Sequence, residues 1–452
     1  MANYRRRQTS LWDQLPEVDP PGLEDVKAFL DVLSEFDEPL VRELERRRGN
    51  GRDDYPVVPM WNLFAIMHYL RRARRSAVLE ELKRNARLAK LLGFERKPDG
   101  HYRLPPQWAC TRFEQTLRTP EIQEMLNAIV GNTVKELKEE IPDLGEHAAA
   151  DASDIPAWAK PPSRDGTRPS SDEDASWSVK TKTSVNEKGE VVKKTKATFG
   201  YKLYAVVDVK RPVVLAISTQ TGSTNDHAQV PSLLRQTVKN VGVNTVKTLA
   251  MDKGFDSTDV VTACYDYDIK AVVPFRDVPQ NLEQLPPEDR EVPLEPGSNV
   301  VRDRYTGQVC CYDFSSPEPR RQELVYAGFD ASRNAHKFRC PAGALGSSCP
   351  YFDRCSAGRN GEESRQVRIP MRTDPRRFAP IYPRSSRWKR LMRGRTAVER
   401  YNSYVKEVLR LEDHCVRGKA AVHLRVVLCA LTVNLGTLLK TREARCASRV
   451  AA

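Results

Sequence analysis

The sequence predicts an α/β protein that carries an all-helical unit at its N-terminus. Two observations support this fold class. Apolar residues recur at helical spacing up to about residue 142, and short strand-like runs alternate with helical stretches between residues 147 and 275. With 452 residues, the chain is long enough for two or three compact units. We divide it into residues 1–142, 143–276, 277–384 and 385–452.

The unit at residues 1–142 shows several helical patterns in succession. Apolar residues at helical spacing predict helices over residues 60–75, 76–92, 111–117 and 120–140. Arginine runs lie in the same unit, at residues 5–7, 46–48 and 71–75. We expect this unit to contact a nucleic-acid backbone.

The charge of the whole chain points the same way. Lysine and arginine number 73 against 60 acidic residues, which leaves a formal net charge of +13. A further basic run lies at residues 384–395. One such run alone also fits a solvated surface, but four together indicate a polyanionic partner. Nucleic acid is the first candidate for this partner.

No segment has the pattern of a signal peptide or of a membrane span. The most apolar run, residues 420–439, is interrupted by His423, Arg425 and Asn434, which suits a buried helix better than a spanning one. We therefore expect a soluble, cytoplasmic protein.

Five strand-like runs lie in residues 143–276. They cover residues 147–151, 199–209, 213–219, 246–252 and 270–275, with helical stretches at 229–240 and 257–267. The turn residues 210–212 predict an antiparallel hairpin between the second and third runs. Residues 160–198 are polar with few apolar side chains, and we expect a mobile loop there.

Two aspartates end strand-like runs. Asp151 ends the first run and Asp252 ends the fourth, so both are expected at the carboxyl edge of the sheet, where open α/β sheets place their sites. Two carboxylates at one edge suit Mg²⁺, which prefers oxygen ligands. A strand-end aspartate also often caps the next helix. Asp154 is the alternative to Asp151 as a ligand.

A third carboxylate lies on a predicted helix over residues 394–412. Arg395, Glu399, Asn402 and Lys406 fall within a stripe roughly 60° wide on such a helix, beside a separate apolar stripe. The helix can therefore pack on the sheet while it directs a carboxylate, flanked by two cations, toward a site. The alternative is a surface helix that these ion pairs stabilise.

The end of the chain resembles the Y-x2-R-x3-E-x6-K signature of a large superfamily of bacterial insertion-sequence DDE transposases. Arg395, Glu399 and Lys406 stand at its R, E and K positions. Met392 takes the place of its tyrosine, a departure that concerns a tyrosine-dependent contact and not the metal site.

Three upstream segments resemble motifs of the same family in the same order. AADASDIPAW resembles the strand of the first aspartate, with Asp151-Ala152-Ser153 in place of D-G-T. FGYKLYAVVD resembles its G-Y-K-L-H strand, with Tyr204 in place of the histidine. LAMDKGFDS resembles its A-D-K-G-Y-D-S strand and turn. The N-terminal helical unit is also similar to the domain that precedes the catalytic core, so the resemblance covers about residues 59–439.

The resemblance implies an RNase H-like core with a mixed sheet flanked by helices, divided by the insertion at residues 277–384. It implies Mg²⁺ or Mn²⁺ bound by Asp151, Asp252 and Glu399, cleavage of DNA at terminal inverted repeats, and strand transfer into target DNA by a homodimer or higher oligomer. The phosphate-positioning residues would be Lys202, Arg395 and Lys406. The alternatives are a catalytically inactive DNA-binding protein derived from a transposase and an RNase H-like nuclease without strand transfer.

The insertion holds five of the ten cysteines. Cys340, Cys349 and Cys355, joined by one residue of the Cys310-Cys311 pair, could close a tetrahedral Zn²⁺ site in a segment that lacks a convincing core of its own. Cys310 is our first choice for the fourth ligand and Cys311 our second. The alternative is a set of thiols without metal.

Overall fold

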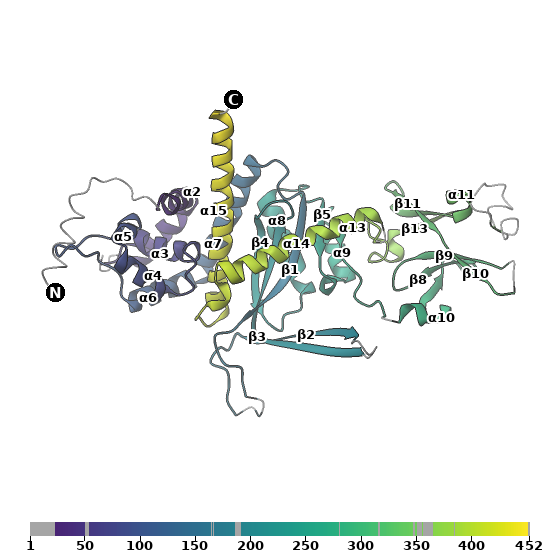
Figure 1. Ribbon diagram of the computed structural model, residues 1–452, viewed down its shortest axis with the longest axis horizontal. Coiled ribbons are helices and arrows are strands. Elements are labelled where there is room, and N and C mark those ends of the chain that lie inside the picture. The colour runs from purple at the N-terminus through teal and green to yellow at the C-terminus, as the bar shows by residue number, and fades with distance from the viewer. Residues whose placement is uncertain are drawn as a thin grey trace.

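A computed structural model describes residues 23–450 apart from 50–53, 164, 166, 186–190, 280, 315–316, 347–348, 350–354, 356–364 and 384. The basic run at residues 5–7 lies outside the described residues. The N-terminal helices, the central sheet and the insertion follow one another along the longest axis of the molecule (Figure 1). The carboxylates of interest lie in the central part.

Six helices build the N-terminal unit in the described residues. They are α2 (Glu24–Arg48), α3 (Val57–Tyr69), α4 (Arg75–Arg84), α5 (Ala86–Leu91), α6 (Gln107–Leu117) and α7 (Pro120–Glu140). The helix expected over residues 76–92 is split at Asn85, whose side chain accepts a hydrogen bond of 3.0 Å from the Leu88 backbone N–H. Asparagine favours this capping conformation over a continuous helix.

The central sheet is mixed. Its strands are β1 (His147–Pro156), β2 (Ser176–Val185), β3 (Val191–Asp208), β4 (Val214–Thr221), β5 (Thr248–Met251) and β6 (Lys270–Val272). β1 is antiparallel to β3, and β3 to β4, whereas β5 runs parallel to both β1 and β6. The expected hairpin between the second and third strand-like runs is therefore present, as β3 and β4.

The expectation of a mobile loop over residues 160–198 was wrong for its second half. β2 pairs with the first half of β3 from Ser176 opposite Gly200 to Val185 opposite Val191, and this ribbon projects from the sheet (Figure 1). Alternating serine, threonine, valine and lysine suit a strand. The ribbon has few apolar residues because it does not cover the core.

Gly200 marks the place where the ribbon leaves the sheet. A Cβ atom there would collide with the backbone carbonyl oxygen of Ile155 on β1. Glycine therefore allows β3 to pass close to β1 at this point.

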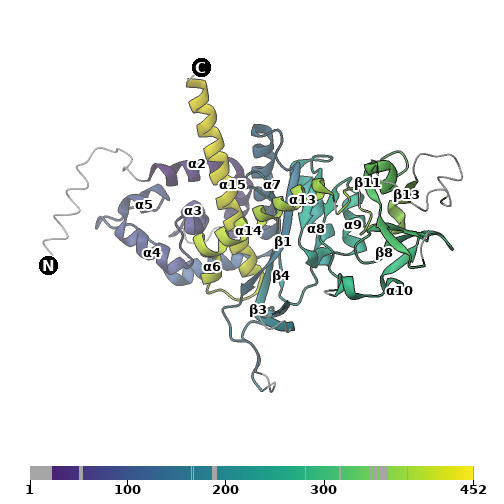
Figure 2. The ribbon, with the colours of Figure 1, turned by 45° about the vertical axis from the view of Figure 1, so that its right-hand side comes forward.

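Helix α15 (Lys419–Val450) joins the N-terminal unit to the sheet. It packs against α7 and α3 on one side and against β4 on the other, and it stands between these two parts in both views (Figures 1 and 2). One continuous hydrophobic core contains residues of all three regions. The boundary at residue 142 separates helix from strand, but it does not divide the core.

By length and composition alone, α15 is apolar enough to cross a membrane. Most of its apolar window, 83%, is however buried inside the fold. The expectation of a buried helix at residues 420–439 is consistent with this packing. Asn434 in this helix is fully buried and bonds the backbone of Val214 on β4 through both its amide atoms.

The helix expected over residues 394–412 is interrupted. After α13 (Ser386–Met392) and a 3-10 turn, α14 covers Thr396–Ser403, and a π-helical turn follows over Tyr404–Val408. Arg410 then adopts a left-handed conformation with φ 60°. A π-helical turn widens the helix locally, and such turns are frequent at functional sites.

The insertion follows β6 and precedes α13. Its first sheet contains β7 (Glu291–Pro293), β8 (Val300–Asp303), β9 (Val309–Asp313) and β10 (Arg320–Glu323), and its second contains β11 (Val325–Asp330), β12 (Ala335–Arg339) and β13 (Gln366–Pro370). In the part of the insertion that the structure describes, two short α-helices accompany them, α10 (Pro287–Arg290) and α11 (Pro341–Leu345). A small separate core, which includes Phe338, Phe378 and Tyr382, lies between these elements.

Candidate functional site

The pairing of β1 with β5 brings two predicted ligands together. Ala150 on β1 lies opposite Met251 on the parallel strand β5. Asp151 follows Ala150, and Asp252 follows Met251. Neighbouring strands lie about 4.8 Å apart. The two aspartates are therefore neighbours at the carboxyl end of β5. Asp252 follows its strand as predicted, but the expectation that Asp151 ends a strand was wrong, because pairing with β3 continues β1 to Pro156.

The proximity of the two aspartates affects the proton affinity of Asp151. Burial is the largest cause that raises its pKa, to about 6, and the negative charge of Asp252 raises it further. The backbone N–H of Ala152 and the positive charges of Arg395 and Lys180 act in the opposite direction. Asp151 is thus a partly buried carboxylate whose charge is incompletely balanced by protein groups, which favours binding of a cation there.

Helix α14 covers the same edge of the sheet. Asn402 is 7% exposed, and its Nδ2 donates a hydrogen bond of 3.2 Å to Oδ2 of Asp151. Its Oδ1 is buried without a hydrogen-bond partner among the described residues. Asn402 stood in the predicted polar stripe, but the stripe alone gave no reason to assign it a contact with Asp151.

Glu399 lies one helical turn before Asn402. Its Oε1 accepts a hydrogen bond of 2.6 Å from Arg395, and about half of the Glu399 side chain is exposed. Arg395 is also close enough to Asp151 to lower its pKa. Arg395 and Glu399 thus form an ion pair, and Arg395 links this pair to Asp151. Among the described residues, Glu399 and the two aspartates do not come together as one metal-binding group.

Asp154, the alternative ligand, points elsewhere. Its carboxylate accepts a hydrogen bond of 2.9 Å from Ser178 and pairs with Lys180 at 2.8 Å, both on β2. Side chains three residues apart on a strand lie on opposite faces. The structure therefore places Asp151, and not Asp154, beside Asp252.

Two lysines expected near phosphate have protein partners. Lys202 is 8% exposed and its Nζ donates to Asp226 at 2.8 Å and to the Thr224 carbonyl at 2.9 Å. Lys406 lies in the π-helical turn, where its Nζ donates to the Asp154 carbonyl at 2.5 Å and pairs with Glu412 at 2.8 Å. These contacts hold the turn before α8 (Val230–Val241) and anchor the π-helical turn to β1.

A contact that the sequence did not indicate joins the insertion to the site region. Arg376 of the insertion forms an ion pair with Asp256, with Nε to Oδ1 at 2.8 Å, and also pairs with Asp277 at 2.6 Å. Asp256 is 5% exposed and lies four residues after Asp252. No local sequence pattern predicts a contact between residues as far apart in the sequence as Asp256 and Arg376.

The cysteines of the insertion fall into two groups. Cys340, Cys349 and Cys355 line one pocket together with Cys311, our second choice for a fourth ligand. Cys310, our first choice, is fully buried and does not line that pocket. Adjacent strand residues face opposite sides of a sheet, which separates the two side chains.

Neither the paired aspartates nor the pocket cysteines form an assembled metal site. Among the residues that the structure describes, no group of three or more His, Cys, Asp or Glu side chains could hold an ion. The donor chemistry nevertheless fits a divalent cation at the pair Asp151 and Asp252, because the amide group of Asn402 contacts Asp151. The oxygen of this amide is buried and has no hydrogen-bond partner among the described residues.

The antiparallel strands β1, β3 and β4, followed by parallel strands and an acidic pair at the β1–β5 edge, are consistent with an RNase H-like domain that acts on polynucleotides. The family described as Transposase DDE domain matches residues 146–435, which is more than half of the chain. The chain therefore belongs to this transposase family. Comparison with curated proteins gives no match.

Proposed function

We propose that this protein is an active transposase of a bacterial insertion sequence, which cleaves DNA at the element ends and joins them to target DNA. The observation that carries the proposal is the pair Asp151 and Asp252, adjacent on parallel strands and incompletely neutralised by protein groups. An inactive DNA-binding descendant would have no use for this pair.

Asp151, Asp252 and Glu399 would hold Mg²⁺ or Mn²⁺. The bound metal supplies charge neutralisation at the scissile phosphate and activates water or a 3′-hydroxyl as nucleophile. Asn402 orients Asp151 through its 3.2 Å hydrogen bond. Arg395, held by Glu399, offers a guanidinium to phosphate oxygens at the same edge.

The carboxylates are tested by amide substitution in the full-length protein. We expect Asp252→Asn and Glu399→Gln to abolish metal-dependent nicking of labelled DNA ends and to leave DNA binding nearly intact, because each change removes charge but little volume. Asp259→Asn, an exposed change on α9 (Thr258–Tyr265), is the matched control and retains activity. Full nicking by Asp252→Asn would remove that residue from the site.

The same assay distinguishes the alternatives. A transposase yields both cleaved ends and a product joined to target DNA, whereas a nuclease without strand transfer yields cleaved ends only. An inactive descendant binds DNA and yields neither. Matching terminal inverted repeats on both sides of the coding region would support the insertion-sequence assignment.

We further propose that the N-terminal helices bind the element ends through phosphate contacts. Arg71, Arg74 and Arg84 are exposed around α4 and suit this role. Their joint replacement by glutamine should weaken binding and reduce the salt dependence of the affinity by about one phosphate contact per arginine. Replacement of Arg42, which lies outside the arginine runs and pairs with Glu38 on α2, is the control.

Point variants suit this test better than a deletion. Because the N-terminal helices share a hydrophobic core with α15 and the sheet, removal of residues 1–142 would expose the apolar side of α15. Loss of binding in such a deletion would not separate lost contacts from lost folding. Unchanged binding by the triple glutamine variant would contradict the assignment.

A further inference from the structure

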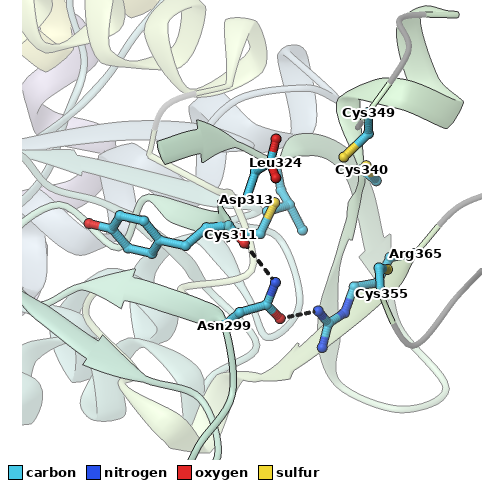
Figure 3. A pocket seen from close by; sticks show the side chains of 9 residues that line it. Asn299, Cys311, Asp313, Leu324, Cys340, Cys349, Cys355 and Arg365 are labelled. Carbon is cyan, nitrogen blue, oxygen red and sulfur yellow. Dashed lines mark hydrogen bonds between the residues drawn. The ribbon is translucent and has the colours of Figure 1, made fainter. Parts of the chain in front are cut away.

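A second site of defined chemistry lies in the insertion, away from the paired aspartates. One pocket is lined by four sulfur-bearing side chains and by several polar neighbours, among them Asn299 and Arg365 (Figure 3). The four cysteines are Cys311, Cys340, Cys349 and Cys355.

The four cysteines come from two different sheets and from one connection. Cys311 lies on β9 of the first small sheet, and Cys340 follows β12 of the second. Cys349 and Cys355 lie in the connection between β12 and β13. A backbone hydrogen bond of 2.9 Å from Cys340 N–H to the Arg365 carbonyl closes the base of this connection. It therefore begins and ends at the pocket that its own cysteines line.

The local core is small for the length of this segment. Only seven buried side chains form the hydrophobic cluster of the insertion in the described residues, against more than a hundred residues between positions 277 and 384. Domains with little buried apolar surface usually require a disulfide or a metal ion. The structure carries these four cysteines as thiols and not as disulfides.

We propose that Cys311, Cys340, Cys349 and Cys355 together bind one structural Zn²⁺, which links the two small sheets of the insertion. Four thiolates form a tetrahedral set that favours zinc over hard cations. As placed, the side chains do not yet form an assembled metal site.

The polar neighbours suit a site with net negative charge. Four thiolates around Zn²⁺ carry two negative charges in excess. Arg365 lies at the pocket, and its Nη1 donates a hydrogen bond of 2.5 Å to Asn299, which in turn donates to the Tyr312 carbonyl at 2.9 Å. These two hydrogen bonds hold the Arg365 guanidinium at the pocket that the sulfur atoms line. Residues next to metal ligands commonly orient them in this way.

The test compares two adjacent cysteines in the full-length, reduced protein. Elemental analysis of protein prepared without chelator should give one zinc per chain. Cys311→Ser should lower the zinc content at least several-fold, whereas Cys310→Ser, whose side chain does not line the pocket, should retain it. Equal zinc content in both variants would overturn the ligand set, and absence of zinc from the wild type and from metal-free protein titrated with Zn²⁺ would overturn the site.

A second measurement covers the case in which Cys311→Ser fails to fold. Cys349→Ser changes a residue of the connection outside the hydrophobic core, and it should also lose the metal. Substitution with Co²⁺ should give the intense charge-transfer absorption of a tetrahedral thiolate site in the wild type and in Cys310→Ser only. Disulfide-linked peptides among the four cysteines in freshly purified protein would show a redox pair and contradict the zinc assignment. None of these readouts depends on transposase activity.

Discussion

Asn402 donates a hydrogen bond of 3.2 Å to Asp151 across the gap between α14 and β1. This bond ties the helix that carries Glu399 to the strand that carries the first aspartate. Substitution of a residue that hydrogen-bonds a metal-binding side chain commonly changes the metal affinity about 10–100-fold. Asn402 therefore belongs with the proposed site as a positioning residue.

We expect Asn402→Ala to raise the Mg²⁺ concentration for half-maximal nicking roughly tenfold, while saturating Mg²⁺ restores most of the rate. A purely structural role would lower the rate at all Mg²⁺ concentrations equally. Asn132→Ala, on the surface of α7, is the control. An unchanged metal dependence would exclude Asn402 from the site.

The raised pKa of Asp151 predicts a pH-dependent stability. Its folded-state pKa, about 6, lies above the ordinary value of 3.8. The folded protein therefore binds this proton more tightly than the unfolded chain, and the resulting stabilisation is lost as the pH rises through about 6.

Asp151→Asn should therefore be more stable than the wild type at pH 8 in metal-free buffer, by about 1–2 kcal/mol, and this difference should shrink toward pH 5. Thermal melts across this range measure it. Mg²⁺ should stabilise the wild type and have little effect on the variant. A variant that is less stable at pH 8 would contradict the effect assigned to Asp151.

Glu114 is the buried ionic link between the N-terminal helices and α15. It is fully buried and pairs with Arg75, with Arg118 at 2.6 Å and with Arg425 at 3.3 Å. Burial opposes its ionisation, but these three arginines together hold the pKa of Glu114 below its usual value.

Glu114→Gln should lower the free energy of unfolding by about 3–5 kcal/mol, because it leaves the buried Arg425 and two partly buried arginines without a counter-charge. Denaturant titration measures this loss. Glu80→Gln removes an exposed partner of Lys83 and should leave the midpoint unchanged. Equal stability of the two variants would show that the buried link is dispensable.

Arg376 couples the insertion to the chain segment that follows Asp252. Arg376→Met should release Asp256 and Asp277, increase proteolysis within residues 277–384, and reduce nicking without weakening DNA binding. Arg372→Met, an exposed change nearby, is the comparison. Unaltered proteolysis and nicking would mean that the insertion is held by its apolar contacts alone.

The sequence was most informative where short patterns have one physical meaning. The strand-end pattern placed Asp252 correctly after β5 and beside Asp151 of the neighbouring parallel strand, although Asp151 itself lies within β1. The helix predicted over residues 120–140 is α7 with the same bounds. The family match agrees with the resemblance of the strand and helix motifs.

Contacts between distant residues were not predictable from one sequence. Lys202 matched a family motif, but its pairing with Asp226 depends on the turn before α8. The choice between Cys310 and Cys311 required the register of β9, because a shift of one residue exchanges the two faces of a strand. The π-helical turn after α14 interrupts a pattern that reads as one continuous helix.

The central position of α15 has a consequence for how the protein is made. Its residues are synthesised after those of α3 and α7, yet they cover the apolar faces of these two helices. A nascent chain therefore cannot complete the core between these helices until α15 has been synthesised. A chain truncated before residue 419 would leave the apolar faces of α3 and α7 uncovered.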